Sequence, residues 1–150
     1  MVSTAEGVQL IAAETGRLKE YVSGTDAKEW NLDSPCEGWT VGDVIGHLGW
    51  AAEFFADAIS QGRRGITSPP HGLPEIGSIA STELPAFIAD KAKEYKQDAG
   101  EDLSYAFASS VDRLQALFSS MEADEWAKEC WSFRLLQPAS AYVTTRISEV

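Results

Sequence analysis

The stretch TVGDVIGHLGWAAEFFADAIS, residues 40–60, decides the fold of this chain. Thr40 can accept a hydrogen bond from the backbone N–H of Asp43, and the Asp43 carboxylate can accept one from Thr40, which is the capping box that starts an α-helix. Apolar residues then recur at steps of three and four, which places them on one helix face. They are Val44, Leu48, Ala51, Phe55 and Ala58. The sequence therefore predicts a helix from Val41 onward with one buried face.

His47 lies on the buried side of this predicted helix, because it follows Val44 by three residues. A histidine on an apolar helix face is more often a core residue with one hydrogen bond than a metal ligand. Spacing alone leaves both interpretations open and favours the first.

Helical patterns flank this segment on both sides. Ser3, with Glu6 three residues later, predicts the start of a first helix, and Gly24 predicts its end. The stretch 25–39 is rich in turn-forming residues and is interpreted as a connector. A long stretch rich in Pro and Gly follows the helix that begins at Val41, and a connection of that length can run along a bundle.

Three further helical patterns follow the long connection. The first begins at Leu84 and is interrupted near Gly100, and the last begins near Pro138, which suits a first helical turn. Between them a longer segment keeps one face apolar through Leu103, Phe107, Val111, Leu114 and Met121. The chain is therefore predicted to be an all-α helical bundle.

The composition favours one acidic domain over residues 1–150. The chain is 44% hydrophobic, which is enough apolar material for a single core. Its formal net charge of −11 repels phosphate backbones and anionic lipid head groups, so neither nucleic acid nor a membrane is an expected partner. No apolar run reaches the roughly 20 residues that span a bilayer, and the start MVSTAEGVQL lacks the pattern of a signal peptide. We therefore expect a cytoplasmic protein.

Three other side chains, Cys36, Cys130 and His71, are of residue types that can form sites. Cys36 and Cys130 are far apart and lack CxxC spacing, which favours reduced thiols over a disulfide framework or a zinc ribbon. Cys36 precedes a helix start, where the helix field can activate a thiol, but no paired base is near it in sequence, so a structural role is favoured. His71 falls in the Pro-rich connection and is interpreted as a surface residue.

Glu149 shares one stripe of the last predicted helix with Tyr142 and Arg146. A carboxylate on an inner stripe needs a partner or a cation, and a Glu that faces a His across a bundle core is how metal sites in helix bundles are built. The alternative is an end residue that is exposed or paired with Arg146. The pattern leaves both open.

The stretch SPCEGWTVGDVIGHL, residues 34–48, resembles the opening signature of the N-terminal domain of mycothiol-dependent maleylpyruvate isomerases, within the DinB and YfiT-like metalloenzymes. A Cys-x-Gly-Trp-Thr turn and a histidine at the middle of the next helix occur together at the family's spacing. The stretch RISEV, residues 146–150, is similar to the start of the family's last-helix motif, in which a histidine follows a glutamate by four residues. The likeness covers nearly the whole chain.

This resemblance implies a four-helix bundle with a long crossover between its second and third helices. It also implies a divalent metal, zinc by preference, held by two histidines and one carboxylate. His47 carries over as the first ligand and Glu149 as the carboxylate. The second histidine would fall past Val150, so we expect weak or absent metal, a truncated last helix and no C-terminal domain in this chain.

The resemblance further implies a metal-dependent isomerase or thiol S-transferase that uses a low-molecular-weight thiol such as mycothiol on a small electrophilic substrate. Addition of the thiolate, rotation and elimination would isomerise the substrate, whereas retention of the sulfur would transfer the thiol. This activity requires a site completed beyond Val150. The alternative is a non-catalytic module that binds a small molecule or forms a homodimer, for which the five tryptophans could supply an aromatic pocket or contact.

Overall fold

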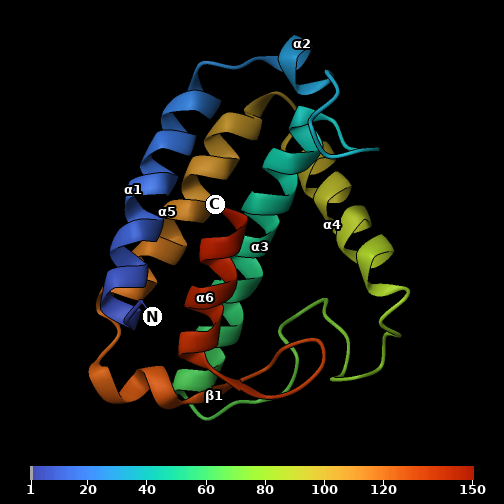
Figure 1. The fold of residues 1–150 in the computed structure, drawn as a ribbon. Helices are drawn as coiled ribbons and strands as arrows, with labels where there is room; N and C mark the ends of the chain where they lie inside the picture. The colour runs from blue at the N-terminus through green and yellow to red at the C-terminus, as the bar shows by residue number, and fades with distance from the viewer. Residues whose placement is uncertain (1) are drawn as a thin grey trace.

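The computed structural model describes residues 2–150 and is built mostly from helices (Figure 1). In chain order the elements are α1 (Thr4–Ser23), α2 (Ala27–Trp30), α3 (Val41–Arg63), α4 (Leu84–Ala99), the 3-10 helix η1 (Gly100–Asp102), α5 (Leu103–Ser120), the 3-10 helix η2 (Ala123–Ala127), β1 (Glu129–Cys130), β2 (Gln137–Pro138) and α6 (Ala139–Glu149). The two short strands pair antiparallel. The prediction of an all-α fold is confirmed.

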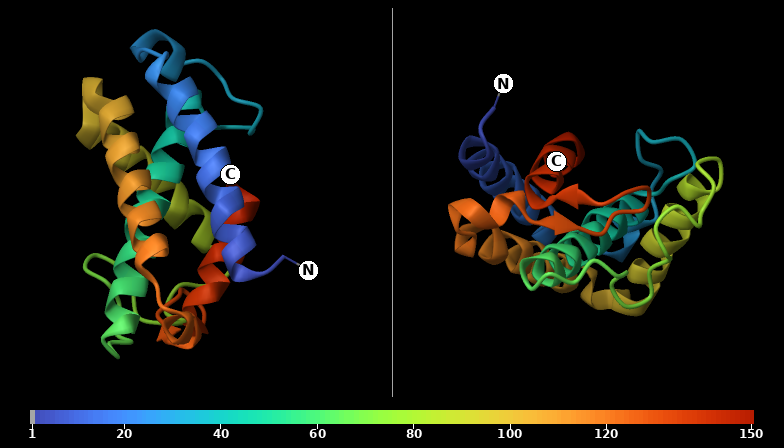
Figure 2. Two further views of the ribbon diagram at one scale, coloured as in Figure 1. Left: turned by 90° about the vertical axis from the view of Figure 1, so that its left-hand side faces the viewer. Right: turned by 90° about the horizontal axis from the view of Figure 1, so that it is seen from below.

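Four of the long helices enclose the core as a ring. Helix α1 packs against α5 and α6, and α3 packs against the same two helices. Figure 2 shows this ring end-on, with α4 outside it on the far side of α3 from α1. The bundle implied by the resemblance is therefore present, and α4 is an additional helix that flanks it.

The two helix starts that the sequence predicted from capping residues are present. The Ser3 side chain accepts a hydrogen bond from the N–H of Glu6 at the start of α1. At the start of α3, Thr40 Oγ1 accepts from the N–H of Asp43, and Asp43 Oδ2 accepts from the N–H of Thr40, both at 3.1 Å. This reciprocal pair fixes where α3 begins and therefore which face carries His47.

Two pieces of secondary structure were not predicted. The stretch interpreted as a connector contains α2, whose start is capped by the Asp26 carboxylate. Trp30 at its end is buried, and its indole N–H donates to Thr25 Oγ1 at 2.8 Å. The β1–β2 pair precedes α6 in a stretch without any clear periodicity. Both elements are too short for a periodic pattern to reveal them.

The long crossover runs through residues 64–83, between α3 and α4. It is tied to the loop that joins β1 to β2 (Figure 1). The Trp131 indole N–H donates to the Pro74 carbonyl at 3.1 Å, and the Gly77 N–H donates to the Phe133 carbonyl at 2.8 Å. These bonds anchor the crossover at the end of the bundle opposite α2.

Ion pairs link the outer faces of neighbouring helices. Lys19 of α1 pairs with Asp112 of α5, and Arg113 of α5 pairs with Glu53 and Asp57 of α3. Exposed pairs of this kind each contribute little to stability.

Within the described part of the chain, no helix combines the length and the apolarity needed to cross a membrane.

Helix α4 approaches α3 closely because α3 presents glycines to it. A Cβ on Gly46 would lie 2.4 Å from the carbonyl oxygen of Ala92, and one on Gly49 would lie 2.6 Å from the Tyr95 ring. A side chain at Gly46 would clash with the α4 backbone, and a side chain at Gly49 would clash with the Tyr95 ring. This contact sets the position of the α4 residues that border the candidate site.

Gly46→Ala is expected to lower the free energy of unfolding by about 2 kcal/mol, because the backbone of α4 must move away. The matched control is Gly16→Ala, where a Cβ would meet nothing within 4 Å. That change should stabilise α1 by up to about 1 kcal/mol through helix propensity. Urea unfolding measures both, and equal stability of the two variants would contradict the close approach of α3 and α4.

Candidate active site

The structure brings His47 and Glu149 together. His47 Nε2 on α3 lies 3.2 Å from Glu149 Oε2 on α6, although 102 positions separate them in sequence. Their side chains are 24% and 16% exposed, so the pair lies at the edge of the core and remains accessible from outside. The convergence expected from the resemblance is therefore present, and the role of the pair as metal ligands stays a prediction.

Arg146 holds the other oxygen of Glu149. Its Nη1 lies 3.1 Å from Glu149 Oε1 and 3.1 Å from the carbonyl oxygen of Leu48, and it donates to both. Burial lowers the pKa of this guanidinium, and the neighbouring carboxylate opposes that shift. The sequence presented a pairing with Arg146 and a contact with His47 as alternatives, and the structure shows both, one on each carboxylate oxygen.

The second ring nitrogen of His47, Nδ1, is buried and has no hydrogen-bond partner among residues 2–150. The tautomer with its proton on Nε2 therefore satisfies the pair best, because Nε2–H then donates to Glu149 Oε2. The Trp39 ring packs against the imidazole in a T-shaped contact, with centroids 5.8 Å apart. Sequence reasoning assigned Trp39 no place in the site, although it belongs to the Cys-x-Gly-Trp-Thr turn.

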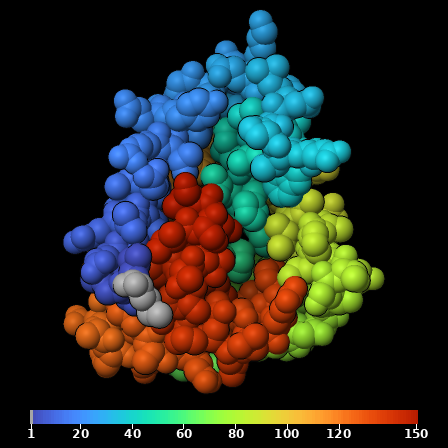
Figure 3. Space-filling view, in the orientation of Figure 1, coloured from blue at the N-terminus to red at the C-terminus, as the bar shows by residue number. Residues whose placement is uncertain are grey.

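A hollow of about 540 Å³ opens beside the pair, a volume within the usual range for small-molecule sites. Its wall is mostly apolar and comes from the connector before α3, from α3, from α4 and from α6. The lining residues are Cys36, Trp39, Val44, His47, Leu48, Pro85, Ile88, Ser148 and Glu149. Figure 3 shows the end of α6, in red, next to α3.

The other candidate residues, Cys36, Cys130 and His71, lie in three different environments. Cys36 is exposed and lines the hollow, whereas Cys130 is fully buried, and both thiols are free as predicted. Burial raises the pKa of Cys130 to about 11. His71 is exposed and borders a different hollow near Trp50 and Lys91. Of the two histidines, only His47 lies at the site.

The donor atoms of His47 and Glu149 are of the types that bind a divalent cation, but two ligands are fewer than a zinc site usually has. Imidazole nitrogen and carboxylate oxygen are ligands that zinc prefers. Residues 2–150 contain no group of three or more His, Cys, Asp and Glu side chains placed to hold a metal ion. His47 and Glu149 would therefore supply two ligands, and further ligands would have to come from water, a bound thiol or another protein group.

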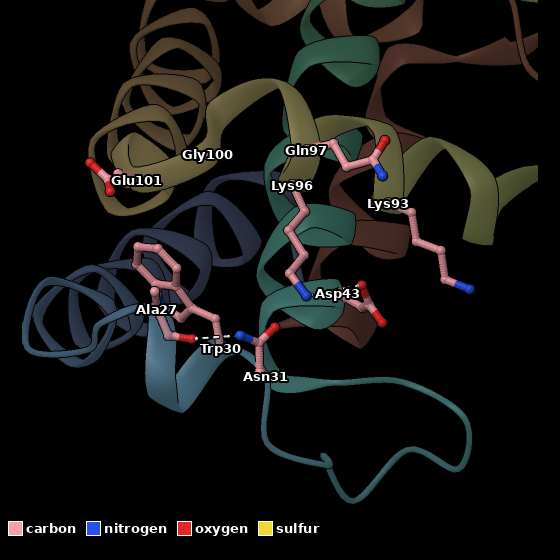
Figure 4. Close-up of a pocket in the computed structure, with 9 residues that line it drawn as sticks. All are labelled: Ala27, Trp30, Asn31, Asp43, Lys93, Lys96, Gln97, Gly100 and Glu101. Carbon is pink, nitrogen blue, oxygen red and sulfur yellow. Dashed lines mark hydrogen bonds and ion pairs between the residues drawn. The ribbon is translucent and has the colours of Figure 1, made fainter.

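A second hollow, of about 450 Å³, lies between α2, the first turn of α3 and the last turns of α4 (Figure 4). It is lined by Ala27, Trp30, Asn31, Asp43, Lys93, Lys96, Gln97, Gly100 and Glu101. Its buried carboxylate, Asp43, already caps α3 and faces the Lys96 ammonium at 3.7 Å. The Lys96 ammonium also donates to Thr40 Oγ1 at 3.1 Å. These groups stabilise the start of α3, so the hollow beside His47 is the stronger candidate for chemistry.

Residues 11–150 match the family described as the mycothiol maleylpyruvate isomerase N-terminal domain. Two solved structures are similar: the crystal structure of the mycothiol-dependent maleylpyruvate isomerase, with a TM-score of 0.72, and that of a histidine-to-alanine mutant, with a TM-score of 0.77. Each matches 99% of this chain at 21% identity, a level at which the likeness shows the fold alone. This chain spans 57% and 58% of their lengths. A comparison with curated proteins found no match.

A thiol reagent applied to the folded protein at pH 8 is expected to modify Cys36 and spare Cys130. The Cys130 thiol is fully buried, and with a pKa of about 11 only about one molecule in a thousand is thiolate at that pH. Peptide mass spectrometry after labelling identifies the modified residue, and Cys36→Ser serves as the control. Rapid labelling of Cys130 without unfolding would contradict its position.

Proposed function

The chain belongs to the mycothiol maleylpyruvate isomerase N-terminal domain family, and we propose that it is the metal-binding, thiol-using part of an isomerase or thiol S-transferase. The observation that carries this proposal is the contact between His47 Nε2 and Glu149 Oε2, 3.2 Å apart in the wall of the apolar hollow. An imidazole and a carboxylate at a small-molecule hollow are the groups such chemistry requires.

His47 through Nε2 and Glu149 through Oε2 would hold the cation, and zinc accepts both kinds of donor atom. When bound, such an ion supplies Lewis acidity and favours the thiolate form of a coordinated thiol. Because two protein ligands chelate less firmly than three, we expect weaker binding than at a complete zinc site. Coordination positions that these two residues do not fill would be open to a low-molecular-weight thiol.

The apolar wall defines the substrate in this proposal. Trp39, Val44 and Ile88 can pack on the carbon skeleton of a small electrophile and hold it beside the pair. Among the described residues, no lysine or arginine lines the hollow. The arginine nearest the pair, Arg146, is buried behind Glu149 and already engaged with it. The protein part of this wall therefore supplies no cationic side chain to pair with an anionic group of the substrate, and the proposed cation would be the positive charge beside it.

The second candidate function is a module that binds a small molecule without catalysis. It is favoured by one observation, namely that His47 Nε2 and Glu149 Oε2 lie within hydrogen-bond distance of each other with no cation between them. A bound cation would have to replace that bond with its own. Metal content separates the two functions, since the module requires none.

Zinc binding to the purified protein tests the proposed function. We expect about one Zn²⁺ per chain at saturation, and we expect His47→Ala and Glu149→Gln to weaken binding by more than the roughly 10- to 100-fold that loss of an outer-shell partner costs. Isothermal titration and elemental analysis give the affinity and stoichiometry, with His71→Ala as the matched control. Absence of zinc binding to the unmodified protein, or a loss caused by His71→Ala instead, would rule the assignment out.

Substrate charge is tested by assaying thiol-dependent conversion of two electrophiles of equal size, one neutral and one a dicarboxylate. Relative to the unmodified protein, Ile88→Lys should shift the preference in kcat/KM toward the dicarboxylate, because it places a further cation in the wall. Ala86→Lys adds the same charge to α4 at an exposed position outside the wall. An equal shift in both variants would show that the hollow does not select the charge of the substrate.

A further inference from the structure

We propose that Arg146 is a positioning residue that decides which oxygen of Glu149 is offered to a ligand in the hollow. The inference rests on the proposed function, because it concerns the carboxylate assigned there to the cation. The starting observation is that the Arg146 side chain is 1% exposed although it carries a full charge. Removing a charged group from water costs free energy unless the group is paired and hydrogen-bonded inside the protein.

The guanidinium joins the two helices that carry the site. Its Nη1 donates to the carbonyl oxygen of Leu48, the residue that follows His47 on α3, and to Glu149 Oε1 on α6. Nη1 therefore links the Glu149 carboxylate to the backbone of α3, the helix that carries His47. The position of Glu149 relative to His47 is therefore set through Arg146 as well as by the direct contact.

The two oxygens of Glu149 consequently have different surroundings. Oε1 is held by a charge-assisted hydrogen bond, and Oε2 faces His47. A carboxylate held in this way can offer a cation one oxygen without releasing the other. Arg146 would therefore leave Oε2 as the oxygen offered to a cation and would keep the carboxylate from turning to present both oxygens.

A purely structural role for Arg146 explains less of the geometry. The buried Nε of Arg146 has no hydrogen-bond partner in the described part of the chain, which makes this side chain a costly way to join two helices. An aliphatic residue of similar length would pack there without that cost. It would leave Oε1 of Glu149 without its donor, and this loss is what distinguishes the two roles.

The test compares Arg146→Met with Arg146→Lys and with the control Arg113→Met, which removes an exposed arginine paired with Glu53 and Asp57. Crystal structures of the metal-free proteins report the distance between His47 Nε2 and Glu149 Oε2, and titration with Zn²⁺ reports affinity. We expect Arg146→Met to break the His47–Glu149 contact and weaken zinc binding about 10- to 100-fold. Arg146→Lys should restore part of both, because lysine keeps the charge without the planar fork, and the control should change neither.

The metal-free distance keeps this proposal separate from the proposed function. If the unmodified protein binds no zinc, the metal assignment fails, and the crystal structures still decide whether Arg146 positions Glu149. If Arg146→Met lowers stability but leaves the two atoms at their original separation, the positioning role is wrong. Should Arg146→Met fail to fold, the same distance in Arg146→Lys decides, because an unchanged contact together with unchanged zinc affinity would overturn the proposal.

Discussion

The Glu149 carboxylate lies between a buried guanidinium and an imidazole, and the rest of the site depends on that arrangement. Glu149 belongs to the last turn of α6, a helix of eleven residues that would be marginal in isolation. Packing of Tyr142 and Val143 in the core holds this helix against the bundle, and the tyrosine hydroxyl donates to the Trp131 carbonyl. The same packing brings Arg146 to the backbone of α3.

The features predicted from sequence are those set by local signals. Thr40 and Asp43 start α3 by a bond between residues three apart, and that start determines that His47 faces inward. Glu149 and Arg146 could be placed on one stripe for the same reason. Their meeting with His47 followed from the resemblance to a known family, because helical periodicity says nothing about which helices become neighbours.

The features that could not be predicted depend on contacts between distant segments. Pro85 and Ile88 border the hollow only because α4 packs closely on the glycines of α3. Trp39 reaches the imidazole through the path of the connector, and Arg146 reaches Leu48 through the approach of α6 to α3. The volume and the apolar character of the hollow result from these packings, so no single stretch of sequence carries them.

The proposed function requires that His47 and Glu149 act together on one cation beside an apolar hollow. An anomalous difference map, recorded at the zinc absorption edge from crystals equilibrated with Zn²⁺, tests this claim most directly. We expect a peak bonded to His47 Nε2 and Glu149 Oε2, with Arg146 still holding Oε1. A zinc-saturated crystal with no peak at this position, and with the imidazole still hydrogen-bonded to the carboxylate, would contradict it.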